Sequence, residues 1–139
     1  MPPKTASART SHWLWPLLLL LGCATALIAW LLVALSLGQQ AGWMAILVAL
    51  ESAFMLRLGT FRPGTARAVI AVVATLGVIL SAQWAIASAQ MGFVMGLDVL
   101  ASCLRMGPRL AWLLSSMANG WFDLACWAVG LVVAWVVAR

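Results

Sequence analysis

The chain has few residues that can carry out chemistry. Its 139 residues include three acidic residues, one histidine and no tyrosine. No Ser-His-Asp set, HExxH motif, glycine-rich phosphate loop or dinucleotide-binding motif is present. General acid–base catalysis needs titratable groups placed around a substrate, and this composition hardly supplies them. We therefore expect a protein that is not an enzyme and that needs no cofactor.

Metal-binding and redox patterns are also missing. Cys23, Cys103 and Cys126 form no CxxC pair, and His12 has no second histidine to act with it. A zinc site needs three or four such ligands at short spacings, so no metal site is expected. Cys103 and Cys126 carry no local signature that favours a disulfide.

What the chain has in abundance is apolar side chains. Hydrophobic residues make up 65% of the sequence and charged residues only 8%, with a mean hydropathy of +1.08. A soluble domain of this composition could not cover its surface. The net charge of +5 does not indicate a nucleic-acid binder, because the basic residues stand at the ends of apolar runs. The composition predicts an integral membrane protein whose surroundings are the lipid bilayer.

Four apolar runs are long enough, or nearly so, to cross a bilayer: residues 13–37, 42–58, 68–90 and 121–138. A hydrocarbon core about 30 Å thick needs roughly 20 helical residues, and two of the runs are somewhat short of that. Continuous apolar runs in lipid must be helical. We predict an all-α fold with a four-helix transmembrane bundle, one domain over residues 13–139, and a disordered cytoplasmic tail at 1–12.

The first run has an alternative interpretation. Leu20-Leu21-Gly22-Cys23 resembles a lipoprotein cleavage box. A cleaved lipoprotein continues with polar residues, whereas this run stays apolar to Leu37, which favours an uncleaved span.

The stretch between the last two runs is amphipathic. Four polar side chains at i, i+4, i+7 and i+11 share one helical face: Asp98, Ser102, Arg105 and Arg109. Charges near the middle of a bilayer are costly, so we predict an interfacial helix over 97–117, broken near Gly107-Pro108, between the third and fourth spans. A fifth span over the same residues is the alternative. Arg105 and Arg109 are candidate contacts for a lipid phosphate or another anion, and Asp123 could pair with them or act as a helix-start anion.

Orientation follows from the basic residues. With four spans, six of the eight fall on one side: Lys4, Arg9, Arg57, Arg62, Arg67 and Arg139. The positive-inside rule then places both termini in the cytoplasm of a multi-pass protein of the cell inner membrane.

Glu51 lies in the second apolar run, about 13 Å below its outer end. Apolar surroundings favour a protonated, hydrogen-bonding carboxyl group. Gln83 in the third run has a similar expected depth of about 10 Å, so we predict a polar pair of Glu51 and Gln83 that joins the two helices. The alternative is a proton or cation site of a small oligomeric transporter or channel.

Small residues recur every fourth position in three runs, in a pattern that favours close helix packing. The three stripes are Ala41, Ala45, Ala49 and Ala53; Gly77, Ser81, Ala85 and Ala89; and Cys126, Gly130, Ala134 and Ala138. Packing features without catalytic ones suggest an accessory, scaffold or assembly partner. Its helix faces would bind another protein or a second copy of the chain.

Overall fold

Six helices account for most of the chain in the computed structural model, which describes residues 13–59 and 61–139. The helices are α1 (Leu14–Leu37), α2 (Met44–Leu58), α3 (Thr65–Met95), α4 (Val99–Arg105), α5 (Pro108–Ala118) and α6 (Trp121–Ala138). No strand occurs in these two ranges. The all-helical class is therefore confirmed for the described residues, whereas the predicted tail at 1–12 lies outside them.

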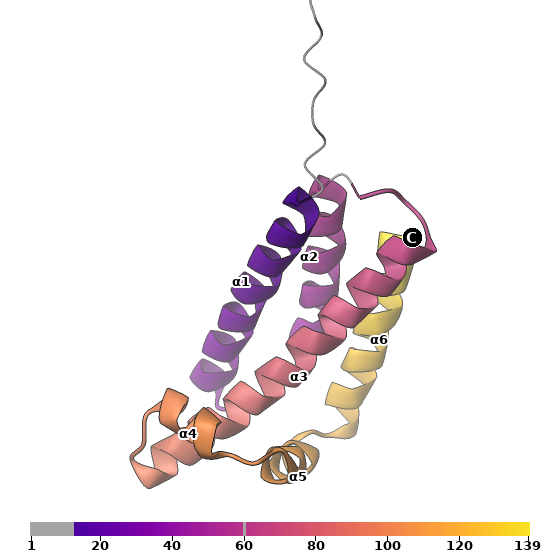
Figure 1. Cartoon of the computed structure of the whole chain (residues 1–139). Helices are drawn as coiled ribbons and strands as arrows, with labels where there is room; N and C mark the ends of the chain where they lie inside the picture. The colour runs from indigo at the N-terminus through magenta and orange to yellow at the C-terminus, as the bar shows by residue number, and fades with distance from the viewer. Residues whose placement is uncertain (1–12, 60) are drawn as a thin grey trace, which may run out of the picture.

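The four long helices form a bundle in which α1 and α3 lie in front of α2 and α6 (Figure 1). The start of α1 and the end of α6 lie at one end of this bundle. Helices α4 and α5 cover the other end, beside the end of α3. An even number of long helices brings the start of the first and the end of the last to the same side.

Helices α2 and α6 make the most extensive contact between helices of the described residues, and two of the predicted small-residue stripes meet there. Ala45, Ala49 and Ala53 of α2 are buried, as are Gly130, Ala134 and Ala138 of α6. A Cβ atom added to Gly130 would lie 3.0 Å from the backbone oxygen of Ala45. These two helices therefore pack backbone against backbone, and their stripes meet within one chain.

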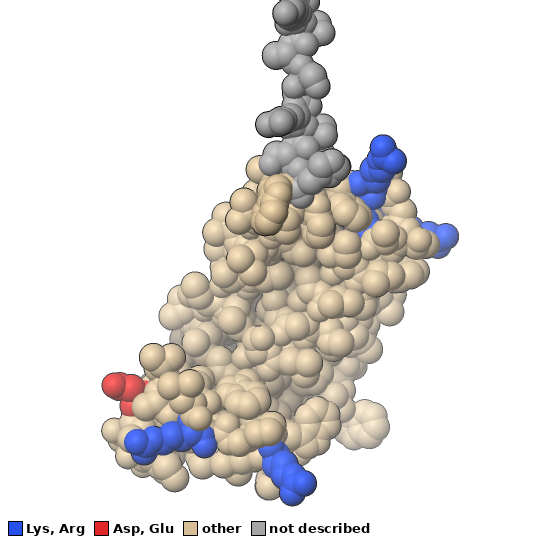
Figure 2. Space-filling view, in the orientation of Figure 1, with Lys and Arg blue, Asp and Glu red and all other residues tan. Residues whose placement is uncertain are grey.

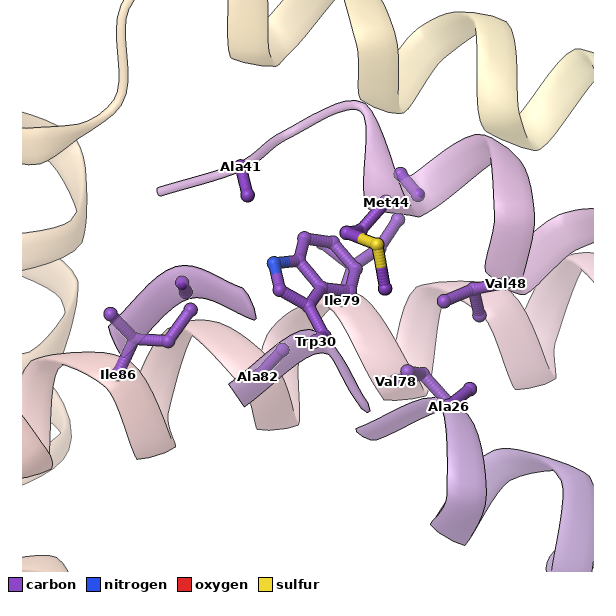
Figure 3. Packing of buried hydrophobic residues seen from close by; sticks show 11 residues of the cluster. Ala26, Trp30, Ala41, Met44, Val48, Val78, Ile79, Ala82 and Ile86 are labelled. Carbon is purple, nitrogen blue, oxygen red and sulfur yellow. The ribbon is translucent and has the colours of Figure 1, made fainter. Parts of the chain in front are cut away.

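Trp30 fills the space among α1, α2 and α3 at the centre of one apolar cluster (Figure 3). Met44 from α2 and Ile79 from α3 lie beside its ring. The side chain is fully buried, and its Nε1–H donates to the backbone oxygen of Gln40 at 3.2 Å. This hydrogen bond gives the buried indole N–H its partner. It also holds the turn between α1 and α2 against the core, because Gln40 belongs to that turn.

Within the described residues, three helices are long and apolar enough to cross a membrane, namely α1, α3 and α6. Many large apolar side chains on these helices face outward, such as Leu20 at 70% exposure and Val132 at 61%. Figure 2 shows charged side chains at both ends of the molecule and none on the band between them on this face. This surface suits a lipid environment and would be unstable in water.

Helix α3 is longer than the apolar run from which it was predicted. Helix α3 was expected over 68–90 and runs on to Met95, because Gly92 lies inside a close contact and does not end the helix. A Cβ atom on Gly92 would lie 2.9 Å from both Leu97 O and Ser102 Oγ, so glycine lets α4 pack back onto α3. The chain turns at Gly96, whose φ of 67° is left-handed.

The amphipathic stretch forms two helices, with the break at Met106 and Gly107 as predicted. The expectation of one continuous polar face over this stretch was wrong. Ser102 is buried against Gly92, while Asp98, Arg105 and Arg109 are exposed. The break between α4 and α5 changes the direction of the chain, so the helical periodicity does not carry through it.

Candidate functional site

Glu51 meets α1. Thr25 Oγ1 lies 2.8 Å from Glu51 Oε1, and also 2.9 Å from the backbone oxygen of Gly22. The hydroxyl group has one hydrogen to donate. That hydrogen is shared among Glu51 Oε1 and the backbone oxygens of Leu21 and Gly22, so the hydroxyl group links the carboxyl group of Glu51 to the backbone of α1.

Gln83 of α3 is hydrogen-bonded to Asn119, which lies between α5 and α6. Its Oε1 accepts a hydrogen bond of 3.1 Å from Asn119 Nδ2, and the side chain is buried. The structure does not bring Glu51 and Gln83 together, because Glu51 is on the side of α2 that faces α1, whereas Gln83 is on the side of α3 that faces the start of α6. Similar depth along two helices says nothing about which faces meet.

The two partners, Thr25 and Asn119, were not predicted from the sequence. Thr25 is a hydroxyl side chain within the first apolar run, and Asn119 lies two residues before the last one, next to Gly120, the N-cap of α6. A polar residue within or beside an apolar run is a signal for an interhelical hydrogen bond. Which of several such residues pair depends on helix rotation, which the sequence does not give.

Asp123 joins the starts of two helices. Its Oδ1 accepts from the backbone N–H of Gly42 at 3.0 Å, just before α2, and its Oδ2 accepts from the N–H of Gly120 at 3.2 Å, at the start of α6. A carboxylate there satisfies free N–H groups and faces the positive ends of two helix dipoles. The interpretation of Asp123 as a helix-start anion is the one that these contacts support.

A cavity of about 460 Å³ lies beside Asp123 at this end of the bundle. The α1–α2 turn, with Gln39 and Gln40, forms much of its wall, and Gln90 from α3 closes another side. A Cβ atom on Gly42 would collide with Asp123, so the glycine allows this close approach. The cavity is therefore shaped by the same contact that ties α2 to α6.

Two arginines bind the opposite end of α6. Arg57 Nη2 donates to Val137 O at 2.9 Å, and the buried Arg67 donates through Nε to Ala138 O. Cationic groups at the last carbonyls of a helix stabilise its C-terminal end. Both residues were predicted only as orientation signals. Their hydrogen bonds show that they also hold α2 and α3 to α6.

Arg105 and Arg109 are exposed at the end of the molecule that carries α4 and α5. Cys23, Cys103 and Cys126 are all free. Within residues 13–59 and 61–139, no group of three or more His, Cys, Asp or Glu side chains could hold a metal ion. The polar contacts described above join helices of the bundle.

Comparison of the chain with models of known protein families, with curated proteins and with solved structures finds no match.

Proposed function

We propose that this protein is a small, non-enzymatic, multi-pass protein of the inner membrane that serves as an accessory or assembly partner of another membrane protein. The observation that carries the proposal is an apolar groove of about 350 Å³ on the outside of the bundle, between α1 and α3. Its lining residues are Leu20, Cys23, Ala24, Leu27, Ala74, Gly77, Val78 and Ser81. We call it the α1–α3 groove.

The α1–α3 groove contains Gly77 and Ser81, the first two residues of the small-residue stripe of α3. Gly77 and Ser81 are exposed, and a Cβ atom added to Gly77 would meet nothing within 4 Å. Small residues let a second backbone come close, which favours association of helices in a bilayer, where burying apolar surface gives little gain. The groove therefore fits a transmembrane helix of a partner protein.

We also propose that α2 completes a fourth crossing. Its 15 residues span about 22 Å, less than the hydrocarbon core, but its start is tied through Asp123 to the start of α6. Its other end is tied through Arg57 to the end of α6. With four crossings, the start of α1 and the end of α6 lie on the cytoplasmic side together with the basic residues of the α2–α3 link.

In this arrangement α4 and α5 lie in the outer interface. Trp112 and Met117 of α5 are 72% and 79% exposed, as expected for side chains that enter the headgroup region. The exposed guanidinium groups of Arg105 and Arg109 would contact water and lipid phosphate.

Glu51 gives less support to a transporter or channel. Its carboxyl group is held by Thr25, and it lines neither the α1–α3 groove nor the cavity beside Asp123. A conduction site should border a hydrated path.

In-cell photocrosslinking tests the partner proposal. Benzoylphenylalanine is placed at Ser81 in the groove or, as a control, at Val132 on the exposed side of α6. We expect a crosslink to one distinct protein from position 81 and none from position 132. Gly77→Leu should abolish that crosslink by filling the groove, and Val132→Leu should not. Adducts of two copies of this chain would favour the oligomeric alternative, and adducts to lipid alone would refute the proposal.

A further inference from the structure

The cavity beside Asp123 has room for a small organic ligand. Its volume of about 460 Å³ lies within the range of roughly 300–1,000 Å³ that is typical of small-molecule sites. Its wall joins the α1–α2 turn to the last part of α3, the end of α5 and the start of α6. These elements lie at the end of the bundle that carries α4 and α5 (Figure 1). We call it the Asp123 cavity.

Asp123 gives this wall its charge. Among the described residues it is the only charged one that lines the cavity, and the wall is more polar than that of the α1–α3 groove. The carboxylate oxygens accept hydrogen bonds from the N–H groups of Gly42 and Gly120, the donors that an anion would otherwise use at these two helix starts. An anionic ligand would therefore meet a like charge in place of those donors. The Asp123 cavity favours a cation.

Two aromatic residues also lie on the wall, Trp43 immediately before α2 and Phe122 at the start of α6. Trp43 is 43% exposed and Phe122 is 70% exposed, so neither ring is taken up by the packing of the bundle. The face of an aromatic ring attracts a cation through its quadrupole. A carboxylate and aromatic rings on one cavity wall are the chemistry that recognises an alkylammonium group.

The hydrogen bonds of Asp123 narrow the ligand class. A primary ammonium group has three N–H donors, which would compete with Gly42 and Gly120 for the carboxylate oxygens. A quaternary ammonium group carries the same charge and has no N–H. Asp123 can therefore attract it without giving up either of the bonds that tie α2 to α6.

We propose that the Asp123 cavity binds a quaternary ammonium group of the choline type, either as a small solute or as the headgroup of a lipid. The charge of Asp123 and the rings of Trp43 and Phe122 would hold the ammonium group. Gln39 and Gln90, which are exposed residues of the same wall, would bond to the oxygen atoms beside it. The site does not depend on the partner proposed for the α1–α3 groove.

Calorimetric titration of the purified protein in a maltoside detergent tests the ligand class. Choline is the probe, and dimethylbutanol, in which carbon replaces the nitrogen, is the uncharged compound of the same shape. We expect choline to bind at least tenfold more tightly than dimethylbutanol. Equal affinities would overturn the proposal, because shape and not charge would then decide binding.

The source of the ammonium group is tested by native mass spectrometry of the protein from nanodiscs with equal amounts of phosphatidylcholine and phosphatidylglycerol. Selective retention of phosphatidylcholine would support the proposal with a lipid headgroup as the ligand, even without binding of free choline. Binding of free choline without selective retention would support it with a solute as the ligand. Neither choline binding nor selective retention would overturn the proposal.

Matched substitutions test the role of the charge. Asp123→Asn removes the charge and keeps one oxygen that can accept from Gly42 N–H. Asp98→Asn makes the same change at an exposed residue of α4's N-cap, which does not line the cavity. We expect the affinity for the choline group to fall at least tenfold in Asp123→Asn and less than twofold in Asp98→Asn. Equal losses would contradict the proposal.

A second matched pair tests the site without touching the contact between α2 and α6. Phe122→Leu removes an aromatic ring from the wall, and Phe93→Leu removes a similarly exposed ring of α3 that does not line the cavity. We expect the affinity to fall about two- to fivefold in Phe122→Leu, as for one lost cation–π contact, and to stay unchanged in Phe93→Leu. This pair decides the matter if Asp123→Asn does not fold. Equal affinities of the two phenylalanine variants would contradict the proposal.

Discussion

Substitutions of Glu51 distinguish two possible roles of this residue. Its carboxyl group either forms a structural hydrogen bond between α1 and α2 or acts as a proton or cation site. Glu51→Gln keeps a group that can both donate to and accept from Thr25 Oγ1, so the free energy of unfolding should change little. Glu51→Met removes the polar end of the side chain and keeps most of its length. Hydrogen bonds between membrane helices average about 0.6 kcal/mol and reach about 1.7 kcal/mol. Because Thr25 is exposed and Glu51 half-buried, we expect about 0.6 kcal/mol for this pair.

A double-mutant cycle measures this energy directly. Thr25→Val and Glu51→Met are combined, and unfolding is followed by helical circular dichroism as SDS replaces a mild detergent. The coupling energy should be about 0.6 kcal/mol. A parallel cycle of Ser36→Ala with Glu51→Met should show none, since Ser36 bonds only to Val33 O of its own helix. No coupling in the first cycle, or a Glu51→Gln variant as unstable as Glu51→Met, would refute the reasoning.

Three further predictions concern an arginine at the end of α6, a glycine at the contact of α3 with α4, and the topology. Arg67→Leu should destabilise the bundle by about 2 kcal/mol, because it removes a buried charge-assisted bond to the end of α6, whereas the exposed Arg57→Leu should cost less than about 1 kcal/mol in the same unfolding assay. Gly92→Ala should cost about 1–3 kcal/mol by overpacking against α4 and should expose that helix to proteolysis, whereas Gly77→Ala, which meets nothing, should be tolerated. Topology reporters fused after residue 139 and inserted between α2 and α3 should both read cytoplasmic; a periplasmic signal after residue 139 would support the fifth span instead.

The sequence predicted the helices better than their contacts. Continuous apolar runs can satisfy their backbone in lipid only as helices, so helical class and approximate boundaries followed from composition. The end of α3 was misplaced because a glycine can end a helix or allow another segment to approach. Gly92 does the second and Gly96 the first. Only the position of α4 distinguishes the two roles.

The candidate polar site shows the same limit. Glu51, Gln83 and Asp123 were singled out as polar groups that need partners, since unpaired polar groups are costly in an apolar environment, and each of them has a hydrogen-bond partner in the structure. Their partners depend on the rotation of each helix about its axis. In α2 and α6 the small-residue stripes set that rotation, and this turns Glu51 toward Thr25. Sequence spacing gives the stripes but not which of them meet.

The mass of the protein as it exists in the membrane tests the central claim, that the α1–α3 groove is covered by another protein. The membrane is extracted with a polymer that keeps native lipid around the protein, and the mass is measured by native mass spectrometry. We expect a complex of this 14.8 kDa chain with a second, different protein, and we expect Gly77→Leu to release the chain as a monomer. A wild-type chain found only at 14.8 kDa, with the groove open to lipid, would contradict the account.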